Sequence, residues 1–157
     1  MQKIRTCLWF DDQAPEAATF YVSVFPNSRI AGVTRHLEGT PGPTGSVMTV
    51  EFVLDGVEFV ALNGGTKYPF SPAVSLVANC ATQEEVDRLW QRLCDDGKEV
   101  QCGWLTDKYG VSWRVVPVAL MEMLSEADTA ASQRAIAVML GMKKLDIATL
   151  QRAYDNA

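Results

Sequence analysis

The sequence has few of the residues that bind metal ions. It contains one histidine, His36, and none of its four cysteines belongs to a C-x-x-C pair. Catalytic zinc and iron sites generally use two or three imidazoles or clustered thiolates. We therefore expect no metal site, and free, mostly buried cysteine thiols. His36 lies beside a stretch rich in glycine and proline, which favours a solvated loop position over a catalytic role.

Positive charge and long apolar runs are also scarce. The chain has 14 lysine and arginine residues against 19 aspartate and glutamate residues, which gives a net charge of −5. Nucleic-acid binding needs a basic surface, so this balance argues against such a partner. No apolar run approaches the roughly 18 residues of a membrane helix. The first residues lack the apolar core of a signal peptide, so we expect a cytoplasmic protein without a membrane partner.

The order of predicted elements occurs twice along the chain. The first copy has a strand, a helix and three further strands, over residues 4–10, 15–25, 29–35, 47–54 and 57–62. Its last two strands are joined by Asp55-Gly56, which between alternating apolar runs is a strong signal for a β-hairpin. The second copy begins with a strand over 73–78 and a helix with the capping-box pattern Thr82-Gln83-Glu84-Glu85. Three short strands follow, over 99–102, 104–106 and 111–116.

This repeat predicts the fold class. A shift of 69 residues places Phe20-Tyr21 of the first helix on Leu89-Trp90 of the second. The sequence therefore predicts an α+β fold in one structural domain, with two β-α-β-β-β modules over 1–65 and 73–118. One helix covers only one face of each sheet, so the uncovered faces of the modules are expected to form a cupped mixed sheet that holds a ligand.

Residues 125–157 lie outside the repeat and are predicted to form a C-terminal helical extension. The pattern indicates two amphipathic helices, over 132–140 and 147–154. Short amphipathic helices need a surface to pack against. The extension either docks on the same domain or packs across a dimer, and the sequence does not decide between the two.

The repeat and three short motifs resemble the vicinal oxygen chelate superfamily of glyoxalase, bleomycin-resistance and dioxygenase proteins, and within it the PhnB-like group. The motifs are Phe20-Tyr21, the run Thr106–Trp113 (T-D-K-Y-G-V-S-W) and the tail Met139–Ile147 (M-L-G-M-K-K-L-D-I). The tail is similar to that of the subgroup labelled 3-demethylubiquinone-9 3-methyltransferase. The resemblance covers residues 1–118 and implies a homodimer, because proteins of this fold commonly build or complete their cups through dimers.

Methyl transfer is not expected from this chain. A typical site for S-adenosylmethionine has a glycine-rich loop after the first strand of a parallel sheet. Here residues 11–15 (D-D-Q-A-P) follow the first strand and contain no glycine. We therefore expect no cofactor.

The resemblance also implies where metal ligands would stand, on the first and last strands of each module. Counting from the aromatic pairs and the final turns places Thr6, Val60, Ser75 and Arg114 at these positions. Two hydroxyls, an alkyl group and a permanent cation supply no strong ligand for a divalent ion. The cup is therefore expected to be metal-free.

Strand alternation extends the expected lining of the cup. If Thr6 faces the cup, Leu8 and Phe10 share its face, and Cys7 and Trp9 face the helix. The Asp55-Gly56 turn pairs Glu51 with Val60 and turns both toward the cup. The predicted ligand-binding residues are Thr6, Leu8, Phe10, Glu51, Val60, Ser75 and Arg114.

These residues leave three functional classes open. The first is a PhnB-like module that binds a small, anionic organic molecule through Arg114, with Glu51 as acceptor. The second is a metal-independent enzyme in which Glu51 is the base and Arg114 stabilises developing negative charge. The third is a dimeric scaffold without a ligand, in which Glu51 and Arg114 pair with each other.

Overall fold

The structure of the chain is a computed structural model that describes residues 1–125 and 129–157. Three positions of the predicted extension over 125–157 (126–128) therefore lie outside the described residues. The chain divides into two compact units, Met1–Phe70 (unit 1) and Ser71–Ala157 (unit 2). None of the helices in the described part of the chain combines the length and the apolar character needed to cross a membrane.

Unit 1 has the predicted strand–helix–strand–strand–strand order. Its elements are β1 (Thr6–Phe10), α1 (Ala14–Val24), β2 (Arg29–Arg35), β3 (Val47–Leu54) and β4 (Val57–Asn63). The strands form one mixed sheet in the order β1-β4-β3-β2, in which β1 and β4 are parallel and the other neighbours are antiparallel. The predicted hairpin is confirmed, because Leu54 pairs with Val57 and Glu51 with Val60.

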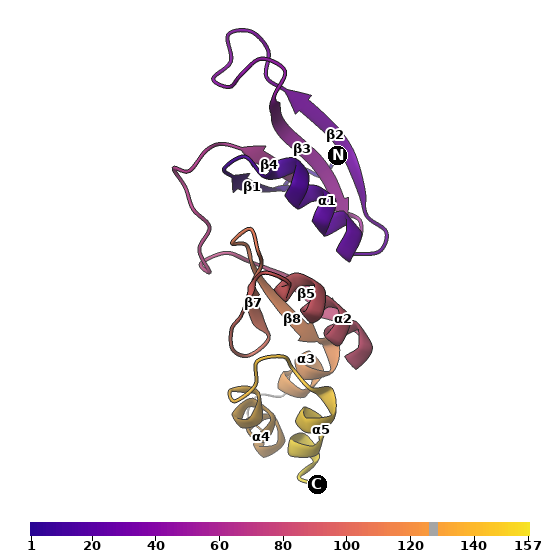
Figure 1. Cartoon of the computed structure of the whole chain (residues 1–157). Coiled ribbons are helices and arrows are strands. Elements are labelled where there is room, and N and C mark those ends of the chain that lie inside the picture. The colour runs from indigo at the N-terminus through magenta and orange to yellow at the C-terminus, as the bar shows by residue number, and fades with distance from the viewer. Residues whose placement is uncertain (126–128) are drawn as a thin grey trace. The chain divides into compact units, whose positions relative to one another are not determined.

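The core of unit 1 lies between α1 and one face of this sheet (Figure 1). Alternate residues of each strand face the helix and form the sheet side of the core. Three of them, Phe10, Phe52 and Phe59, are almost fully buried. The ring of Phe52 stacks on Tyr21 of α1, with centroids 6.2 Å apart, and on Phe59 of β4, at 5.3 Å. These aromatic contacts join the helix to two strands, so α1 is held by packing on its buried face.

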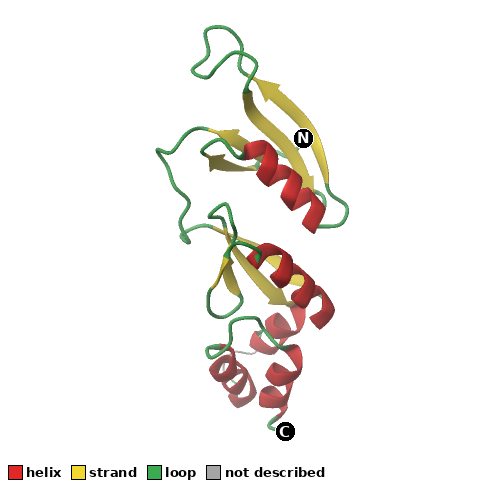
Figure 2. Cartoon of the chain, viewed as in Figure 1, coloured by secondary structure: helices red, strands yellow, loops and turns green. Residues whose placement is uncertain are grey.

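Unit 2 repeats this order and then adds three helices. Its elements are β5 (Ser75–Cys80), α2 (Gln83–Cys94), β6 (Lys98–Glu99), β7 (Trp104–Thr106), β8 (Ser112–Pro117), α3 (Val118–Leu124), α4 (Ala130–Met139) and α5 (Ile147–Asp155). The sheet order is β5-β8-β7-β6, again with the first pair parallel. The predicted α+β class is confirmed: each unit is a β-α-β-β-β module with a four-stranded mixed sheet (Figure 2).

The start of α2 follows the predicted capping pattern. Thr82 is the N-cap, and its hydroxyl accepts the backbone N–H of Glu85 at 3.2 Å. The Glu85 carboxylate in turn accepts the backbone N–H of Ala81 at 2.9 Å. Two donors at the helix start are thereby satisfied, which fixes where α2 leaves the strand.

The C-terminal helices dock on the second module of their own unit. Val116 at the end of β8 shares a buried cluster with residues of α3, α4 and α5, namely Leu120, Met123, Ala135 and Leu150, and with Leu145 between α4 and α5. Helix α3 follows β8 directly and was not predicted. Of the two alternatives for the extension, docking on the same part of the chain is therefore what the described residues support.

Asp107, in the loop between β7 and β8, anchors the end of the second module. It is 3% exposed. Its carboxylate accepts the backbone N–H groups of Tyr109 and Val111 at 2.9 and 3.0 Å, and Nε1 of Trp113 at 2.9 Å. One buried side chain thus closes the turn and fixes the Trp113 ring against the core.

We predict that Asp107→Ala lowers the free energy of unfolding by about 2–4 kcal/mol, because three buried donors lose their acceptor. Urea unfolding measures this change. Asp107→Asn should cost less, since its carbonyl oxygen can still accept the two backbone N–H groups. Glu38→Ala, which removes an exposed carboxylate, is the control and should change the free energy by less than about 0.5 kcal/mol. An Asp107→Ala protein as stable as the control would contradict this role.

Candidate functional site

Each sheet has one face packed on its own helix and a second face turned away from that helix, which we call the open face. In unit 1 the strand pairing orders the open face into three rows across the sheet. The rows are Arg29–Val53–Glu58, then Gly32–Glu51–Val60–Cys7, then Thr34–Thr49–Leu62–Trp9. The surface therefore changes from charged at one end to apolar and aromatic at the other.

The predicted face of β1 is wrong. Thr6 pairs with Phe59, and Leu8 and Phe10 are 5% and 1% exposed, so these three residues share the face that packs on α1. The open face instead carries Cys7 and Trp9.

A one-residue difference between two loops explains the error. Three residues (11–13) separate β1 from α1, whereas two residues (81–82) separate β5 from α2. Counting back the same number of residues from the aromatic pair in each helix reaches Thr6 in β1 and Ser75 in β5. Because successive strand residues point to opposite faces, the extra loop residue places Thr6 on the helix-covered face and Ser75 on the open face. Leu8, Phe10 and Thr6 do not line the open face, and their predicted contact with a ligand there is withdrawn.

Glu51 lies on the open face, as predicted, in the same row as Val60. Its carboxylate pairs with the Arg5 guanidinium at 3.5 Å, and its side chain is 42% exposed. This setting makes Glu51 suited to balance charge on the open face, and it gives no support to the role of a base.

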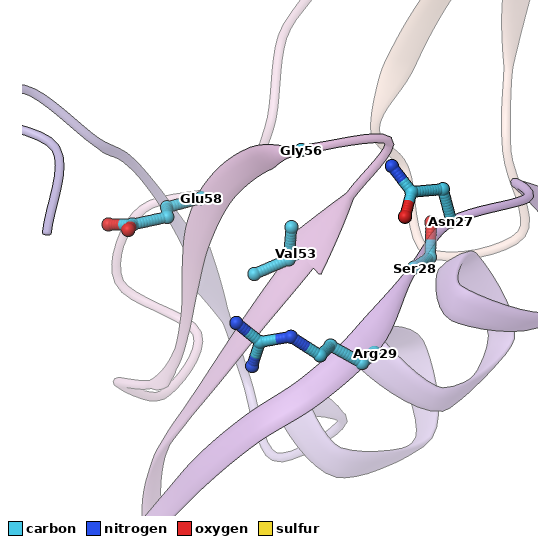
Figure 3. A pocket seen from close by; sticks show the side chains of 6 residues that line it. All are labelled: Asn27, Ser28, Arg29, Val53, Gly56 and Glu58. Atoms are coloured by element: carbon cyan, nitrogen blue, oxygen red, sulfur yellow. The ribbon is translucent and has the colours of Figure 1, made fainter.

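A small cavity of about 380 Å³ lies at the charged end of the open face of unit 1 (Figure 3). The side chain of Arg29 extends from β2 over β3 beside Val53, and Glu58 stands on the next strand. Glu58 is already engaged, because its carboxylate accepts the backbone N–H of Gln2 at 3.1 Å. The lining of the cavity includes one cationic side chain, Arg29, and one anionic side chain, Glu58, which makes it a poor site for a ligand with a single charge.

In unit 2 the predicted faces are those observed. Ser75, Val77 and Asn79 of β5 alternate with the helix-facing Ala78 and Cys80, and Val77 pairs with Arg114 of β8. Val77 is 49% exposed. At the far end of the same face, Val116 is covered by the C-terminal helices. The open face of unit 2 is therefore centred on Arg114.

Arg114 has an unusual environment for a cation. Its guanidinium carbon lies 5.0 Å from the ring centroid of Trp104, its neighbour on β7. Its Nε is buried and, among the described residues, has no hydrogen-bond partner. The next row of the same face, two residues before Arg114 on β8, consists of three hydroxyl side chains: Ser75, Ser112 and Thr106. The arrangement is a half-buried cation backed by an aromatic ring, with hydroxyls beside it and one donor unused.

The sequence did not predict the contact between Trp104 and Arg114. The signal was present, since both residues belong to adjacent antiparallel strands and have the same parity. Their pairing depends on the register of a three-residue strand, which sequence alone does not specify.

His36 is in a loop, but the predicted solvation is wrong, since it is 9% exposed. It lies in the wall of a groove of about 800 Å³ in unit 1, at the carboxyl end of β1. Trp9, Leu62 and Val47 form part of the apolar wall of this groove, and Asp11 and Asp12 stand at its edge. That these residues line one groove was not predicted from the sequence.

The positions that correspond to metal ligands in the resemblance do not form a fitting donor set. With the corrected face of β1, Cys7 takes the place of Thr6 beside Val60, while Ser75 and Arg114 stand in unit 2. An alkyl group and a permanent cation cannot bind a divalent ion. Within residues 1–125 and 129–157, three or more histidine, cysteine, aspartate or glutamate side chains nowhere gather as a metal site requires.

A family model and a solved structure both relate this chain to PhnB-like proteins. Residues 2–116 match the family model described as 3-demethylubiquinone-9 3-methyltransferase. A solved PhnB protein from Bacillus cereus is 38% identical, covers 74% of this chain and 99% of its own, and has a TM-score of 0.68. No protein of curated function matches the chain.

Two more distant structures share the fold. A protein from Pseudomonas aeruginosa is 20% identical over 74% of this chain and 98% of its own, with a TM-score of 0.61. The fosfomycin resistance protein FosX from Listeria monocytogenes, solved with Mn(II) and sulfate, is 14% identical over 81% of this chain and 99% of its own, with a TM-score of 0.56. At these identities the likeness concerns the fold alone.

The corrected face of β1 makes a prediction about thiol reactivity. Cys7 is exposed, although partial desolvation raises the pKa of its thiol and Arg5 partly offsets that rise. Cys80 is fully buried, and burial raises its pKa to about 12, with a further contribution from Glu85. We expect iodoacetamide at mildly alkaline pH to alkylate Cys7 in the native protein well before Cys80, as measured by peptide mass spectrometry.

The Cys7→Ser variant is the control and should lose this early modification. Protection of Cys7 equal to that of Cys80 would indicate that Cys7 faces α1 and would restore the original assignment.

Proposed function

The chain belongs to the family described as 3-demethylubiquinone-9 3-methyltransferase, whose PhnB-like members have the vicinal oxygen chelate fold, and from this premise we propose that it binds a small organic oxyanion through Arg114. The observation that carries the proposal is the half-buried guanidinium of Arg114, which lies against the Trp104 ring and has no ion pair with a carboxylate among the described residues. The proposal concerns binding and includes no chemical step.

An oxyanion would bind the terminal nitrogens of the Arg114 guanidinium, because Nε itself is closed to solvent. A hydrogen bond to a charged group contributes about 1.5–3 kcal/mol. Guanidinium groups match carboxylate and phosphate oxygens because their donors form a planar fork. The Trp104 ring holds the guanidinium from one side, so the side chain is partly pre-organised before a ligand arrives.

The neighbours of Arg114 favour a ligand with polar groups beside its anion. The hydroxyls of Ser75 and Thr106, in the adjacent row of the sheet, are partly exposed and can donate to further ligand oxygens, whereas Ser112 between them is 3% exposed. Val77, 49% exposed, offers an apolar contact on the other side. A small carboxylate, phosphate or phosphonate with a short carbon skeleton fits this combination.

Methyl transfer, the reaction in the family description, has no support in the local structure. In each unit the parallel pairing is limited to one pair of strands, β1 with β4 and β5 with β8. The loop after β1 carries Asp11 and Asp12 where a glycine-rich loop is typical of sites for S-adenosylmethionine. Glu51, which we considered as a base, is ion-paired with Arg5, so we propose no catalytic role for it.

We predict that Arg114→Gln weakens oxyanion binding by about tenfold or more, since it removes a charge-assisted hydrogen bond. The probes are inorganic phosphate, sulfate, benzoate and phenylphosphonate, screened by thermal shift and then titrated by calorimetry. Arg29→Gln removes the same charge from the small cavity of unit 1 and should leave the affinity unchanged. Equal affinity of Arg114→Gln and wild type, or the absence of any stabilising oxyanion, would refute the proposal.

We also propose that the protein is a homodimer, as the resemblance implies. Strand β2 is at the edge of its sheet, and its apolar Ile30 and Val33 are 40% and 49% exposed. An unpaired edge with exposed apolar side chains favours pairing with another chain. A second copy that covers β2 would bury these side chains.

Val33→Lys is therefore expected to shift the protein toward monomer in light-scattering measurements, because a charged lysine opposes pairing at a strand edge. Val118→Lys makes the same change at a residue of α3 that is 39% exposed, and the dimer should persist in it. A monomeric wild type, or an undiminished Val33→Lys dimer, would rule out this interface.

A further inference from the structure

The groove in unit 1 is lined by residues that take no part in the proposed oxyanion site, and its polar atoms are mostly hydrogen-bond acceptors. It measures about 800 Å³, within the range of about 300–1,000 Å³ that is usual for small-molecule sites. Trp9, Val47, Met48 and Leu62 supply much of its apolar wall. The polar groups around this wall determine what kind of ligand the groove can accept.

Most side-chain hydrogen-bond donors of the groove are used inside the protein. Nε1 of Trp9 donates to the Gly65 carbonyl at 2.8 Å, and Nδ2 of Asn63 donates to the Val47 carbonyl at 3.2 Å. The hydroxyl of Ser46 donates to the Pro43 carbonyl at 2.6 Å. Trp9 and Ser46 therefore meet a ligand with their donors engaged, whereas the Asn63 amide keeps a second N–H beyond its bond to Val47.

The backbone around the groove is also poor in free donors. Pro15, Pro41 and Pro43 line it, and proline has no backbone N–H. At the start of α1, where free N–H groups would favour an anion, the Ala14 N–H donates to Oδ1 of Asn63 at 2.8 Å. The start of this helix therefore offers little to a negatively charged ligand.

His36 adds an acceptor to this wall. The Thr40 hydroxyl donates to the Leu37 carbonyl at 2.7 Å, so its oxygen accepts from Nδ1 of His36 at 3.0 Å. With the hydroxyl engaged in this way, the tautomer that fits the contact carries its proton on Nδ1 and leaves the lone pair on Nε2. The ring is held in place by burial, since His36 is 9% exposed.

Gly42 packs closely against the face of the His36 ring. A Cβ at Gly42 would lie 2.3 Å from Nε2 of His36, so any larger residue would displace the ring or cover this nitrogen. Gly42 and His36 both line the groove. The lone pair of Nε2 has no hydrogen-bond partner among the described residues.

Asp11 and Asp12 supply negative charge at the edge of the groove. Both are exposed, and neither carboxylate has an ion pair or hydrogen bond within the described ranges. The groove thus combines an apolar and aromatic wall with an excess of acceptors, namely two carboxylates and one imidazole nitrogen. A ligand that fits must supply the donors and the positive charge.

We propose that this groove binds a small organic ammonium ion with an apolar, aromatic or aliphatic body. The body packs on Trp9, Leu62 and Met48, and the ammonium group donates to Nε2 of His36 and to the carboxylates of Asp11 and Asp12. This site takes a ligand of opposite charge to the oxyanion of Arg114, and it belongs entirely to unit 1. It therefore stands independently of the proposed oxyanion site.

Three probes of the same shape and different charge test the proposal. They are 2-phenylethylammonium, the neutral 2-phenylethanol and the anionic 3-phenylpropionate, titrated into the full-length protein by calorimetry. We expect the ammonium ion to bind at least about tenfold more tightly than either of the others. Tighter binding of the anion, or equal binding of all three, would overturn the proposal.

Two double variants separate a local effect from a change in net charge. Asp11→Asn with Asp12→Asn removes the carboxylates at the groove and should weaken ammonium binding at least about tenfold. Asp95→Asn with Asp96→Asn removes an adjacent pair of carboxylates from unit 2 and should leave binding unchanged. Equal loss in both variants would show that the ammonium ion responds to total charge, which overturns the site.

The single histidine gives a direct readout in the unmodified protein. The ¹⁵N spectrum of the imidazole should show the proton on Nδ1, and 2-phenylethylammonium should shift the Nε2 resonance while 3-phenylpropionate does not. Arg114→Gln should retain this shift, which distinguishes the groove from the oxyanion site. An Nε2 resonance that the ammonium ion leaves unmoved would contradict the proposed contact.

Discussion

The burial of one sheet face under a single helix is the constraint on which the rest of this structure depends. Strand residues alternate in direction, so each position either joins the helix-covered core or stands on the open face. Phe52 and Phe59 face the helix and stack on each other beneath α1. Glu51 and Val60 are their neighbours along the same two strands, and they stand on the open face. Each sheet residue that we propose to contact a ligand is accessible because its position in the strand places it on the open face.

The same constraint decides how much could be predicted from the sequence. The strand–helix–strand–strand–strand order of both units, the hairpin at Asp55-Gly56 and the faces of β5 and β8 follow from local patterns and were predicted correctly. The strand predicted over 99–102 is wrong in its bounds, since β6 is Lys98–Glu99. The face of β1 was not predicted correctly, because one extra loop residue before α1 inverts every assignment on that strand. Helix α3 was missed because Val118–Leu124 is apolar and follows a proline without a capping side chain, so its start carries no sequence signal.

The two proposed sites differ in which hydrogen-bonding atoms the fold leaves unused. Around Arg114 the sheet leaves a donor, and the adjacent aromatic ring and hydroxyls add no negative charge. In the groove of unit 1 the donors of Trp9 and Ser46 and one N–H of Asn63 are engaged internally, and acceptors outnumber the donors that remain. This difference was invisible in the sequence, since it depends on the partners of each polar atom. Composition alone suggested a generally acidic surface and did not separate a site for anions from a site for cations.

The C-terminal segment has a consequence for the order in which the protein folds. The backbone N–H groups of Cys102 and Gly103 donate to the carbonyls of Met142 and Lys143, and Leu145 completes the cluster around Val116. Gln83 at the start of α2 donates to the Leu145 carbonyl and accepts the Ile147 N–H. During synthesis, the second module therefore lacks part of its core until these late residues leave the ribosome. The first module is complete within the first 70 residues and can fold while the second is still being made.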